Sequence, residues 1–513
     1  MNLIYAHDIY RGCIITQAGY YQLAENINWD ATHANSRAIT IACDNVTIDF
    51  AGFTLHQTNT LEPLINTQPY RGFANTVISG NIGVWAENHQ GITIKNGNIS
   101  NIQGVGICLK NCSSIDLSDL NVRNCGRNGA IDTSFLYRNG GIFVIGTNAK
   151  KPNDIIWASN IRMMNCICSH NSSELDFIVT LGSLIQNCEN IEIKDCIFNS
   201  TNNTSSKPSG VQFNVVGIDF VMCRNVLVEN CEAHNNTSGG EVAGFFAWGE
   251  NYRFVNCRAH NNYTLAGHYA CGFNISTTTH LEMIHCEANN NYNANPSASS
   301  DLIPDFSACG FRLGRSVNHA TIKYCHAKGN YNISSNAPIA GFILNSTQNI
   351  IVQDCTATEN YSVTGKSKNK TLIAGFIASA TLPNNKTERY CEGKNNTFIN
   401  CIAHENTIHH VLIHHQSFPH INSQIEINND QITSAGFILE NQENTKIIAS
   451  HILANKGAGI WLRNSVNSVI EKNHIISNGY NSIYDETHAN SFNNLIINNK
   501  IQTVDLNKKD NEI

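Results

Sequence analysis

The chain has 513 residues, a net charge of −7 and only 14% charged residues, against about 25% in an average soluble protein. The acidic balance offers no basic footprint for nucleic acid, and no apolar run approaches the ~18 residues of a membrane span. The first ten residues lack the basic-then-apolar pattern of a signal peptide. We therefore expect synthesis in the cytoplasm, with export by another route left open.

Asparagine, rather than charge, supplies much of the polar character of this chain. There are 75 Asn residues, and Asn is unfavourable in helix interiors but tolerates left-handed turns, which predicts many sharp corners. Nineteen Cys residues are present, an odd number with no Cys-x-x-Cys pair. This pattern disfavours both a disulfide framework and a zinc site.

From the N-terminus, we expect residues 1–35 to form a cap with the first strands, residues 36–502 to be repetitive, and residues 503–513 to be a polar tail. Two short words recur in the central part. The first has a small residue, Gly and an apolar residue, and the second has a polar residue followed by Cys. Examples of the first are Gly217, Gly244, Gly272, Gly310 and Gly341, and examples of the second are Cys231, Cys257, Cys286, Cys325 and Cys355.

The spacing of these words predicts the architecture. Cys231 follows Gly217 by 14 residues, the other pairs agree within one residue, and the extra residues enter between the Cys word and the next Gly. Apolar and polar residues alternate with period two, and helical periodicity is absent. We predict an all-β, single-domain parallel β-helix of about 14 coils, with long loops on one edge.

Stacked coils place equivalent side chains above one another. We expect an Asn ladder at the eighth residue after each Gly, inward columns of Cys, and an inward stack of Phe. The predicted Asn ladder contains Asn190, Asn225, Asn318, Asn349, Asn444 and Asn467. The predicted aromatic stack contains Phe245, Phe273, Phe311, Phe342, Phe376 and Phe437.

The opening of the chain carries a family resemblance. The segments Ile14 to Leu23, Ala38 to Ile41 and Asn45 to Gly52 resemble the opening of bacterial right-handed parallel β-helix repeat proteins of the pectin-lyase-like superfamily. The resemblance extends over about residues 12–502. It implies a carbohydrate ligand bound on the outward face of the strand that follows the longest turn. The motifs of polygalacturonases, pectate lyases and mannuronan epimerases are missing, so no single reaction is implied.

Outward positions on that strand are the second and fourth residues after each Gly, and the polar ones gather on the middle coils. Asp219 and Arg312 are candidate catalytic residues there, together with the loop residues Glu241, His268, Asp301 and Asp305. Phe246, Trp248, Asn274 and Tyr269 are candidate substrate-binding residues. The alternative interpretation is that Asp219 and Arg312 are ordinary surface residues, since any strand face carries some polar side chains.

Two further patterns involve tyrosine and histidine. Tyr263, Tyr292, Tyr331 and Tyr361 follow the Cys residues at a constant spacing; they indicate a packing ladder, with a platform for sugars as the alternative. His410 and His414 have the i, i+4 spacing of metal ligands but no acidic or Cys partner nearby, so a metal site is not predicted. No cofactor is indicated.

Two functions from different classes follow. The first is a carbohydrate-active or polysaccharide-binding protein of the lyase, glycoside hydrolase or epimerase type, which binds an extended glycan in a loop-walled groove. The second is a non-catalytic β-helix scaffold or secreted effector that binds a protein partner.

Overall fold

The structure is a computed structural model, and it describes all residues except 34, 62–64, 67–76, 79, 127–130, 133–136, 149–154, 174–177, 204–214, 266–268, 295–306, 315, 334–337, 363–370, 381–392, 409–431, 477, 480–481, 487–492 and 503–513. It is nearly all β, with one short helix, α1 (Ala6–Ile9), in the described part. The backbone contacts divide the chain into two compact units, unit 1 (1–258) and unit 2 (259–513). No helix of the described residues is long and apolar enough to cross a membrane.

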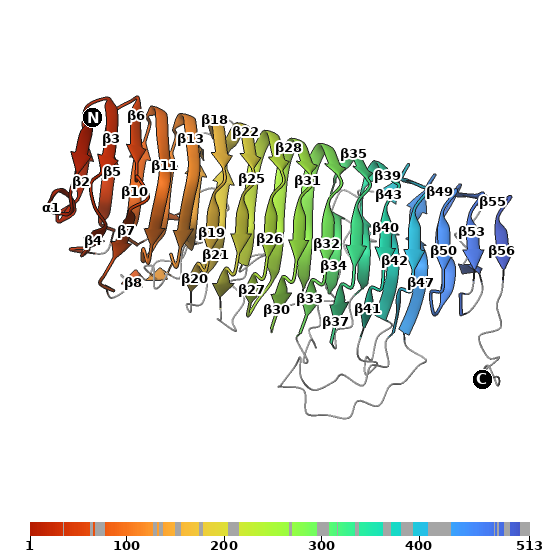
Figure 1. Ribbon diagram of the computed structural model, residues 1–513. Helices are drawn as coiled ribbons and strands as arrows, with labels where there is room; N and C mark the ends of the chain where they lie inside the picture. The colour runs from red at the N-terminus through yellow and green to blue at the C-terminus, as the bar shows by residue number, and fades with distance from the viewer. Residues whose placement is uncertain are drawn as a thin grey trace, which may run out of the picture. The chain divides into compact units, whose positions relative to one another are not determined.

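Unit 1 is built from parallel ladders in which each coil contributes one rung (Figure 1). The first ladder contains the strands that begin near the Gly word. They are β2 (Cys13–Ile15), β5 (Arg37–Ile41), β10 (Ile82–Glu87), β12 (Val105–Lys110), β15 (Tyr137–Ile145), β21 (Ile178–Gln186), the first half of β25 (Val215–Glu229) and the first half of β28 (Val242–Val255).

The second and third ladders of unit 1 follow along each coil. The second contains β1 (Asn2–Ile4), β3 (Gly19–Leu23), β6 (Val46–Asp49), the first part of β11 (Gln90–Ser100) and of β13 (Ser113–Arg123), β18 (Ala158–Met164), β22 (Cys188–Lys194) and the ends of β25 and β28. The third contains β4 (Ile27–Trp29), β7 (Thr54–Gln57), the ends of β11 and β13, β19 (Ile167–Ser169), β23 (Ile197–Asn199) and β26 (Glu232–His234).

Unit 2 repeats the three ladders. The first contains the start of β31 (Ala270–Ile284), then β34 (Ala308–Gly314), β38 (Ile339–Asn345), β42 (Thr371–Ser379), β47 (Ile432–Glu440), β51 (Ala458–Arg463) and β54 (Ile483–Glu486). The second contains the end of β31, then β35 (Asn318–Lys323), β39 (Gln348–Gln353), β44 (Thr397–Ile399), β49 (Lys446–Ile448), β52 (Val469–Glu471) and β55 (Leu495–Ile497). The third contains β32 (Glu287–Asn289), β36 (His326–Lys328), β40 (Thr356–Thr358), β45 (Ile402–His404), β50 (His451–Leu453), β53 (His474–Ile476) and β56 (Lys500–Gln502).

These ladders confirm the predicted fold class, a right-handed parallel β-helix. Eight coils of unit 1 and seven of unit 2 contribute a described rung to the first ladder, close to the predicted number. The boundaries drawn at residues 35 and 502 remain a prediction.

The core of each unit is made of stacked side chains, as the repeat predicted. In unit 2 the rings of Phe311 and Phe342 are stacked with centroids 4.7 Å apart, and Phe376 and Phe437 continue the stack. The Cys residues of the second word are buried in the same way, and all eighteen cysteines of the described residues are free. Burial raises the pKa of the Cys112 thiol to about 11 and that of Cys125 to about 12, so these columns behave as small apolar side chains.

The predicted Asn ladder is present at the corners between the first and second ladders. In unit 1 the Nδ2 of Asn225 donates to the Oδ1 of Asn190 at 3.1 Å, and in unit 2 Asn349 donates to Asn318 at 2.8 Å. Asn190, Asn225 and Asn349 have φ near +55°, a left-handed conformation that Asn tolerates better than most residues. Asn suits this position for two reasons: it tolerates the left-handed turn, and its side-chain amide forms a hydrogen bond with the Asn of the next coil.

A second Asn ladder, inside the core, was missed by the sequence analysis. In unit 2 the amide of each member donates to the Oδ1 of the next at 2.8 to 3.1 Å, and the backbone N–H of the same residue donates to the same oxygen. Its members are Asn262, Asn291, Asn330, Asn360, Asn406, Asn455 and Asn478, and they are buried. The first four directly precede the tyrosines of the repeat, and the ladder satisfies the backbone where each coil turns.

The insertions on the variable edge begin with ordered structure. Short strands there form a fourth parallel ladder, with β20 (Ser172–Ser173), β24 (Asn202–Asn203) and β27 (Thr237–Ser238) in unit 1. In unit 2 it contains β30 (Tyr263–Thr264), β33 (Tyr292–Asn293), β37 (Tyr331–Asn332), β41 (Tyr361–Ser362) and β46 (Thr407–Ile408). The long loops predicted on this edge correspond to segments 235–242, 261–270, 289–308, 328–339, 359–373 and 405–434. Each contains one of these short strands near its start, and the greater part of the longest ones lies outside the described residues.

Candidate functional site

Asp219 lies on the outward side of the first ladder in unit 1, in an otherwise apolar column. On β25 its inward neighbours Ile218 and Phe220 are buried, and its register partners on the adjacent coils are Leu184 and Phe246. The side chain of Leu184 is fully buried, and Asp219 itself is only 5% exposed. A carboxyl group therefore interrupts an apolar column, in a place where ionisation is costly.

Arg138 is the partner of this carboxyl group. Its Nη1 lies 3.6 Å from the Oδ2 of Asp219 and donates a hydrogen bond of 3.2 Å to the Oε1 of Gln186. Gln186 is itself 6% exposed. The three residues come from β15, β21 and β25, three successive coils of unit 1, and we call them the Asp219–Arg138–Gln186 cluster.

Arg138 was not among the residues predicted from the sequence, although residues that precede the Gly on other coils were. Arg138 is three residues before Gly141, and backbone pairing aligns it with Val179. Asp219 is aligned with Leu184, five residues further along β21 than Val179. At 3.3 Å per residue, Arg138 would therefore lie about 16 Å from Asp219 along a straight strand. The ion pair therefore requires the chain to turn near Gly140, so that the Arg138 side chain reaches over the outer face of the ladder. Glu241 and Tyr269 occupy the same place before Gly244 and Gly272, respectively.

Burial dominates the electrostatics of the cluster. Desolvation raises the pKa of Asp219 to about 6, and the nearby Arg138 charge opposes this rise without cancelling it. The Oδ1 of Asp219 and the Nε of Arg138 are buried and have no hydrogen-bond partner within the described part of the chain. The cluster thus holds an acid that titrates close to neutral pH, and it has unsatisfied acceptor and donor atoms.

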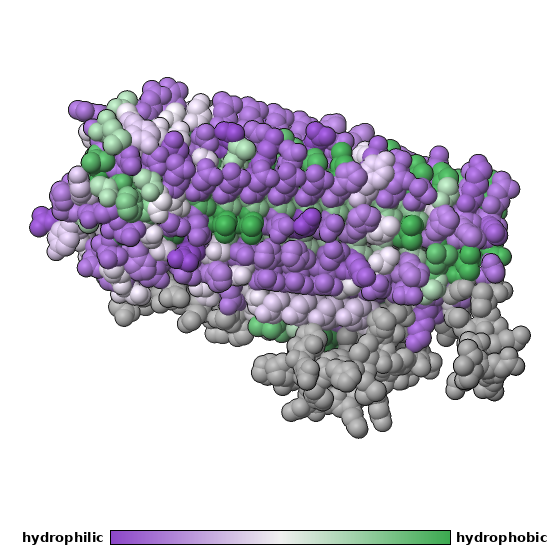
Figure 2. Space-filling model, in the orientation of Figure 1, coloured by the Kyte–Doolittle hydropathy of each residue, from purple (hydrophilic) through white to green (hydrophobic). Residues whose placement is uncertain are grey.

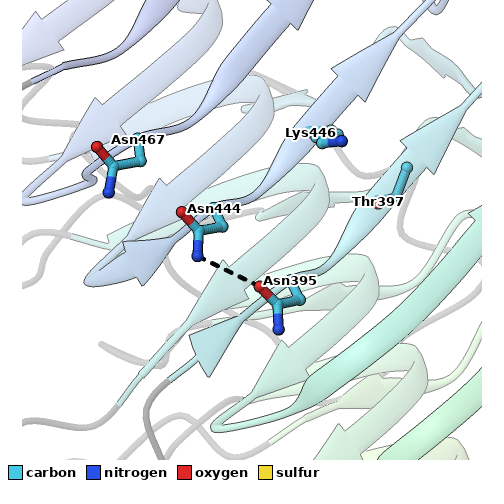
Figure 3. A pocket seen from close by; sticks show the side chains of 5 residues that line it. All are labelled: Asn395, Thr397, Asn444, Lys446 and Asn467. Atoms are coloured by element: carbon cyan, nitrogen blue, oxygen red, sulfur yellow. Dashed lines mark hydrogen bonds between the residues drawn. The ribbon is translucent and has the colours of Figure 1, made fainter.

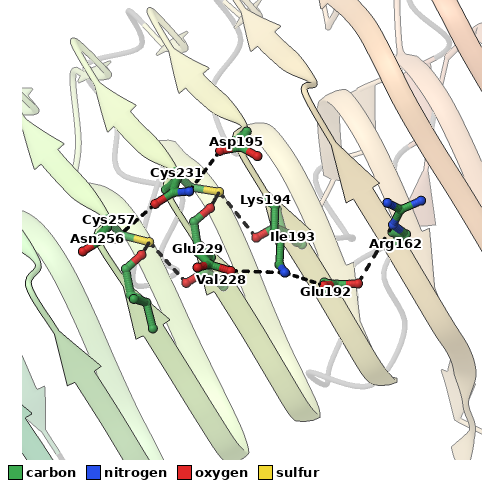
Figure 4. A network of polar contacts seen from close by, with 12 residues as sticks. Arg162, Glu192, Ile193, Lys194, Asp195, Val228, Glu229, Cys231, Asn256 and Cys257 are labelled. Atoms are coloured by element: carbon green, nitrogen blue, oxygen red, sulfur yellow. Dashed lines mark hydrogen bonds and ion pairs between the residues drawn. The ribbon is translucent and has the colours of Figure 1, made fainter.

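The ion pairs on the second ladder of unit 1 show what an ordinary surface arrangement looks like in this protein (Figure 4). Arg162 lies 3.5 Å from Asp116 and 4.0 Å from Glu192, and Lys194 lies 2.8 Å from Glu192 and 3.2 Å from Glu229. The side chains of Arg162 and Asp116 are 51% and 38% exposed. Hydrophilic residues also dominate the strand surface seen in Figure 2. The Asp219–Arg138 pair has a similar separation, but the side chains of Arg138 and Asp219 are only 15% and 7% exposed.

The outward positions of the first ladder are less accessible than the sequence analysis assumed. They were expected to line an open groove, but Asp219, Asn274 and Arg312 are 5%, 1% and 2% exposed. Their neighbours in the same columns explain this, since Leu184 in unit 1 and Ile343 and Ile438 in unit 2 are also outward, apolar and buried. An apolar outward column is stable only when it is covered.

In unit 2, Asn274 and Arg312 are register partners on β31 and β34, and the Nη1 of Arg312 donates to the Oδ1 of Asn274 at 3.0 Å. The structure thus brings these two predicted residues together. Tyr269, just before β31, is 8% exposed. In unit 1, Phe246 is in register with Asp219 and Trp248 with Val221; both aromatic residues and Glu241 are half-buried.

Several predicted residues lie outside the described part of the chain. These are His268, Asp301, Asp305, His410 and His414. Among the residues that the structure describes, no group of three or more His, Cys, Asp or Glu side chains is arranged to hold a metal ion.

The tyrosine repeat forms the packing ladder that the sequence analysis favoured. The rings of Tyr263, Tyr292, Tyr331 and Tyr361 are parallel within 4°, with centroids 4.7 to 4.9 Å apart. Each inner ring therefore has both faces covered by its neighbours. A sugar stacks on an aromatic face, so the inner tyrosines offer no platform.

Comparisons with known proteins give no family. No protein-family model and no curated protein matches the chain. Among solved structures, a mutant of the periplasmic alginate epimerase AlgG is 9% identical with a TM-score of 0.41, covering 82% of this chain and 78% of that one. The A-module of the Azotobacter vinelandii mannuronan C-5 epimerase AlgE4 is 13% identical with a TM-score of 0.35, covering 93% and 91%. A GH136 lacto-N-biosidase from Eubacterium ramulus is 8% identical with a TM-score of 0.33, covering 94% and 62%. These likenesses assign no reaction to this chain.

Proposed function

We propose that this protein is a carbohydrate-active β-helix that acts on a polymer containing uronic acids, with the Asp219–Arg138–Gln186 cluster as its reacting centre. The observation that carries the proposal is a buried carboxyl group with a pKa of about 6 beside a guanidinium group, both with an unsatisfied buried atom. Perturbed acids of this kind gather at functional sites. The resemblance of the opening segments to pectin-lyase-like repeat proteins supports a glycan as the substrate.

The chemistry of the cluster suits proton transfer next to a carboxylate. Asp219 is largely ionised at neutral pH and would take the proton from the sugar carbon that carries the carboxylate. The electron pair left behind is delocalised into that carboxylate, and Arg138 would stabilise the added negative charge. Return of a proton from water to the opposite face gives an epimer. Departure of the neighbouring glycosidic oxygen, which takes a proton from Asp219 or from water, gives an unsaturated sugar. Because Asp219 is 5% exposed, a substrate reaches it only after the side chains around it move aside.

The test compares Asp219→Asn with the wild-type protein on a panel of uronate and neutral polymers. Elimination is followed by the absorbance of the unsaturated product and epimerisation by proton NMR. Loss of a general base lowers turnover by about 10² to 10⁴-fold, and we expect no turnover of neutral polymers. Asp116→Asn is the matched control, because it removes the same charge from a partly exposed Asp–Arg pair of unit 1. Unchanged turnover in Asp219→Asn would contradict the proposal.

A non-catalytic scaffold is the second candidate, and one observation favours it. Arg312 and Asn274 are buried and bonded to each other, as polar pairs in a structural role often are. A scaffold predicts no turnover of any polymer by the wild-type protein. It also predicts a partner whose binding depends on the insertions at 289–308 or 405–434 and survives the Asp219→Asn substitution.

A further inference from the structure

A polar pocket lies on the second ladder of unit 2, where three successive coils turn from their corners into β44, β49 and β52 (Figure 3). It has a volume of about 380 Å³ and is lined by Asn395, Thr397, Asn444, Lys446 and Asn467. This volume falls within the range of small-molecule sites. Every lining side chain carries a hydrogen-bonding group, so the pocket suits a polar ligand.

The Asn ladder of unit 2 is interrupted at this pocket. Up to Asn444 the ladder is continuous, since Asn395 donates to Asn349 at 3.1 Å and Asn444 donates to Asn395 at 3.3 Å. Asn467 is the next member, but its side chain makes no hydrogen bond with another described residue, and Figure 3 shows it apart from Asn444. The Oδ1 of Asn444 and the amide of Asn467 therefore remain available, one as an acceptor and the other as both donor and acceptor.

The pocket also carries one positive charge. Lys446 is exposed and has no ion-pair partner among the residues that the structure describes. It is in register with Thr397 on the neighbouring coil, so a lysine and a threonine side chain come from adjacent strands two residues beyond Asn395 and Asn444. In the network of Figure 4, on the second ladder of unit 1, Lys194 is instead paired with the carboxylates of Glu192 and Glu229.

We propose that this pocket binds a uronate unit of an acidic oligosaccharide. The carboxylate of the sugar pairs with the ammonium group of Lys446, since a charge-assisted hydrogen bond is stronger than a neutral one. The hydroxyl groups of the sugar form hydrogen bonds with the unpaired Oδ1 of Asn444, with the amide of Asn467 and with the hydroxyl group of Thr397. The pocket is made entirely by unit 2, so the inference does not rest on any reaction at Asp219.

The test measures binding of three probes by isothermal titration calorimetry and ligand-observed NMR. The probes are D-galacturonate, D-galactose, which lacks the carboxylate, and acetate, which lacks the hydroxyl groups. We expect D-galacturonate to bind most tightly and Lys446→Ala to weaken it about tenfold, the effect of losing a hydrogen bond to a charged group. Thr397→Val, which keeps the shape of the side chain, gives a smaller loss.

A matched control shows whether binding of D-galacturonate depends on this pocket. Lys323→Ala removes the same charge from the second ladder of unit 2 outside the pocket and should leave the binding of D-galacturonate unchanged. An equal loss in Lys323→Ala would overturn the proposal in favour of diffuse electrostatic attraction. Equal affinity for D-galactose would exclude the pairing with Lys446, and equal affinity for acetate would exclude the contacts to the hydroxyl groups. Melting temperatures of all variants confirm that the surface substitutions leave the fold intact.

Discussion

The buried carboxyl group of Asp219 makes a sharp prediction about stability and pH. Its pKa rises from 3.8 to about 6 in the folded protein, a difference worth about 3 kcal/mol at 1.36 kcal/mol per pKa unit. The folded state therefore holds the proton more tightly than the unfolded state. Stability should fall as the pH rises through the window between these two pKa values, and the loss should be complete above about pH 6. This value already includes the favourable charge of Arg138, which is the smaller effect.

Asp219→Asn isolates this effect, because asparagine resembles the protonated acid and cannot ionise. Near pH 4 the variant and the wild-type protein should be about equally stable, and near pH 8 the variant should be more stable by up to about 3 kcal/mol. Chemical unfolding followed by circular dichroism at these pH values measures the difference. Asp116→Asn, in a partly exposed pair, should change stability by less than about 1 kcal/mol at either pH. If Asp219→Asn is less stable than the wild type near pH 8, the ion pair outweighs desolvation and our reasoning is wrong.

Other parts of the structure give further predictions. Asn330→Ala removes four hydrogen bonds from the buried ladder and should cost more than about 3 kcal/mol, whereas Asn349→Gly, in the exposed ladder, should cost about 1 kcal/mol or less in the same unfolding experiment. Phe342→Ala removes the middle of the aromatic stack and should cost about 3 to 5 kcal/mol, seen as a lower melting temperature. Of the eighteen described cysteines, only Cys13 and Cys43 are partly exposed, so peptide mapping after brief alkylation of the native protein should find label on these two and little on the rest.

The sequence predicted features that follow from stacking. Once the Gly and Cys words fix the coil, residues at equal offsets must lie above one another, so the ladder at Asn225 and the stack at Phe342 followed directly. The buried ladder through Asn330 was equally periodic, but its Asn-Tyr pairs were interpreted as a tyrosine ladder and not as an amide ladder. That the Asn330 side chain points inward becomes clear only from the register of the fourth ladder, whose strands begin at the tyrosines that follow these asparagines.

The site was harder to predict than the fold because it depends on where the chain departs from regular geometry. Alternation correctly gave the outward direction of Asp219, but it could not show that the outward column is covered. Nor could spacing bring Arg138 to Asp219, since that contact needs a turn before Gly141 and joins residues 81 positions apart. A strongly polar residue in an otherwise apolar column was the available signal, and it pointed to Asp219 but not to its partner.

Both candidate sites lie where one coil departs from the pattern of its neighbours. In a stacked repeat, a substitution compatible with the column costs little, because the neighbouring coils supply a matching surface. A residue that breaks the column must be compensated, or it must leave atoms unsatisfied. Asp219 breaks an apolar column and retains an unpaired buried oxygen, and Asn467 fails to extend the ladder that Asn444 leaves open. These unsatisfied groups are available to a ligand, so departures from the repeat, more than the repeat itself, are where binding and chemistry should be sought.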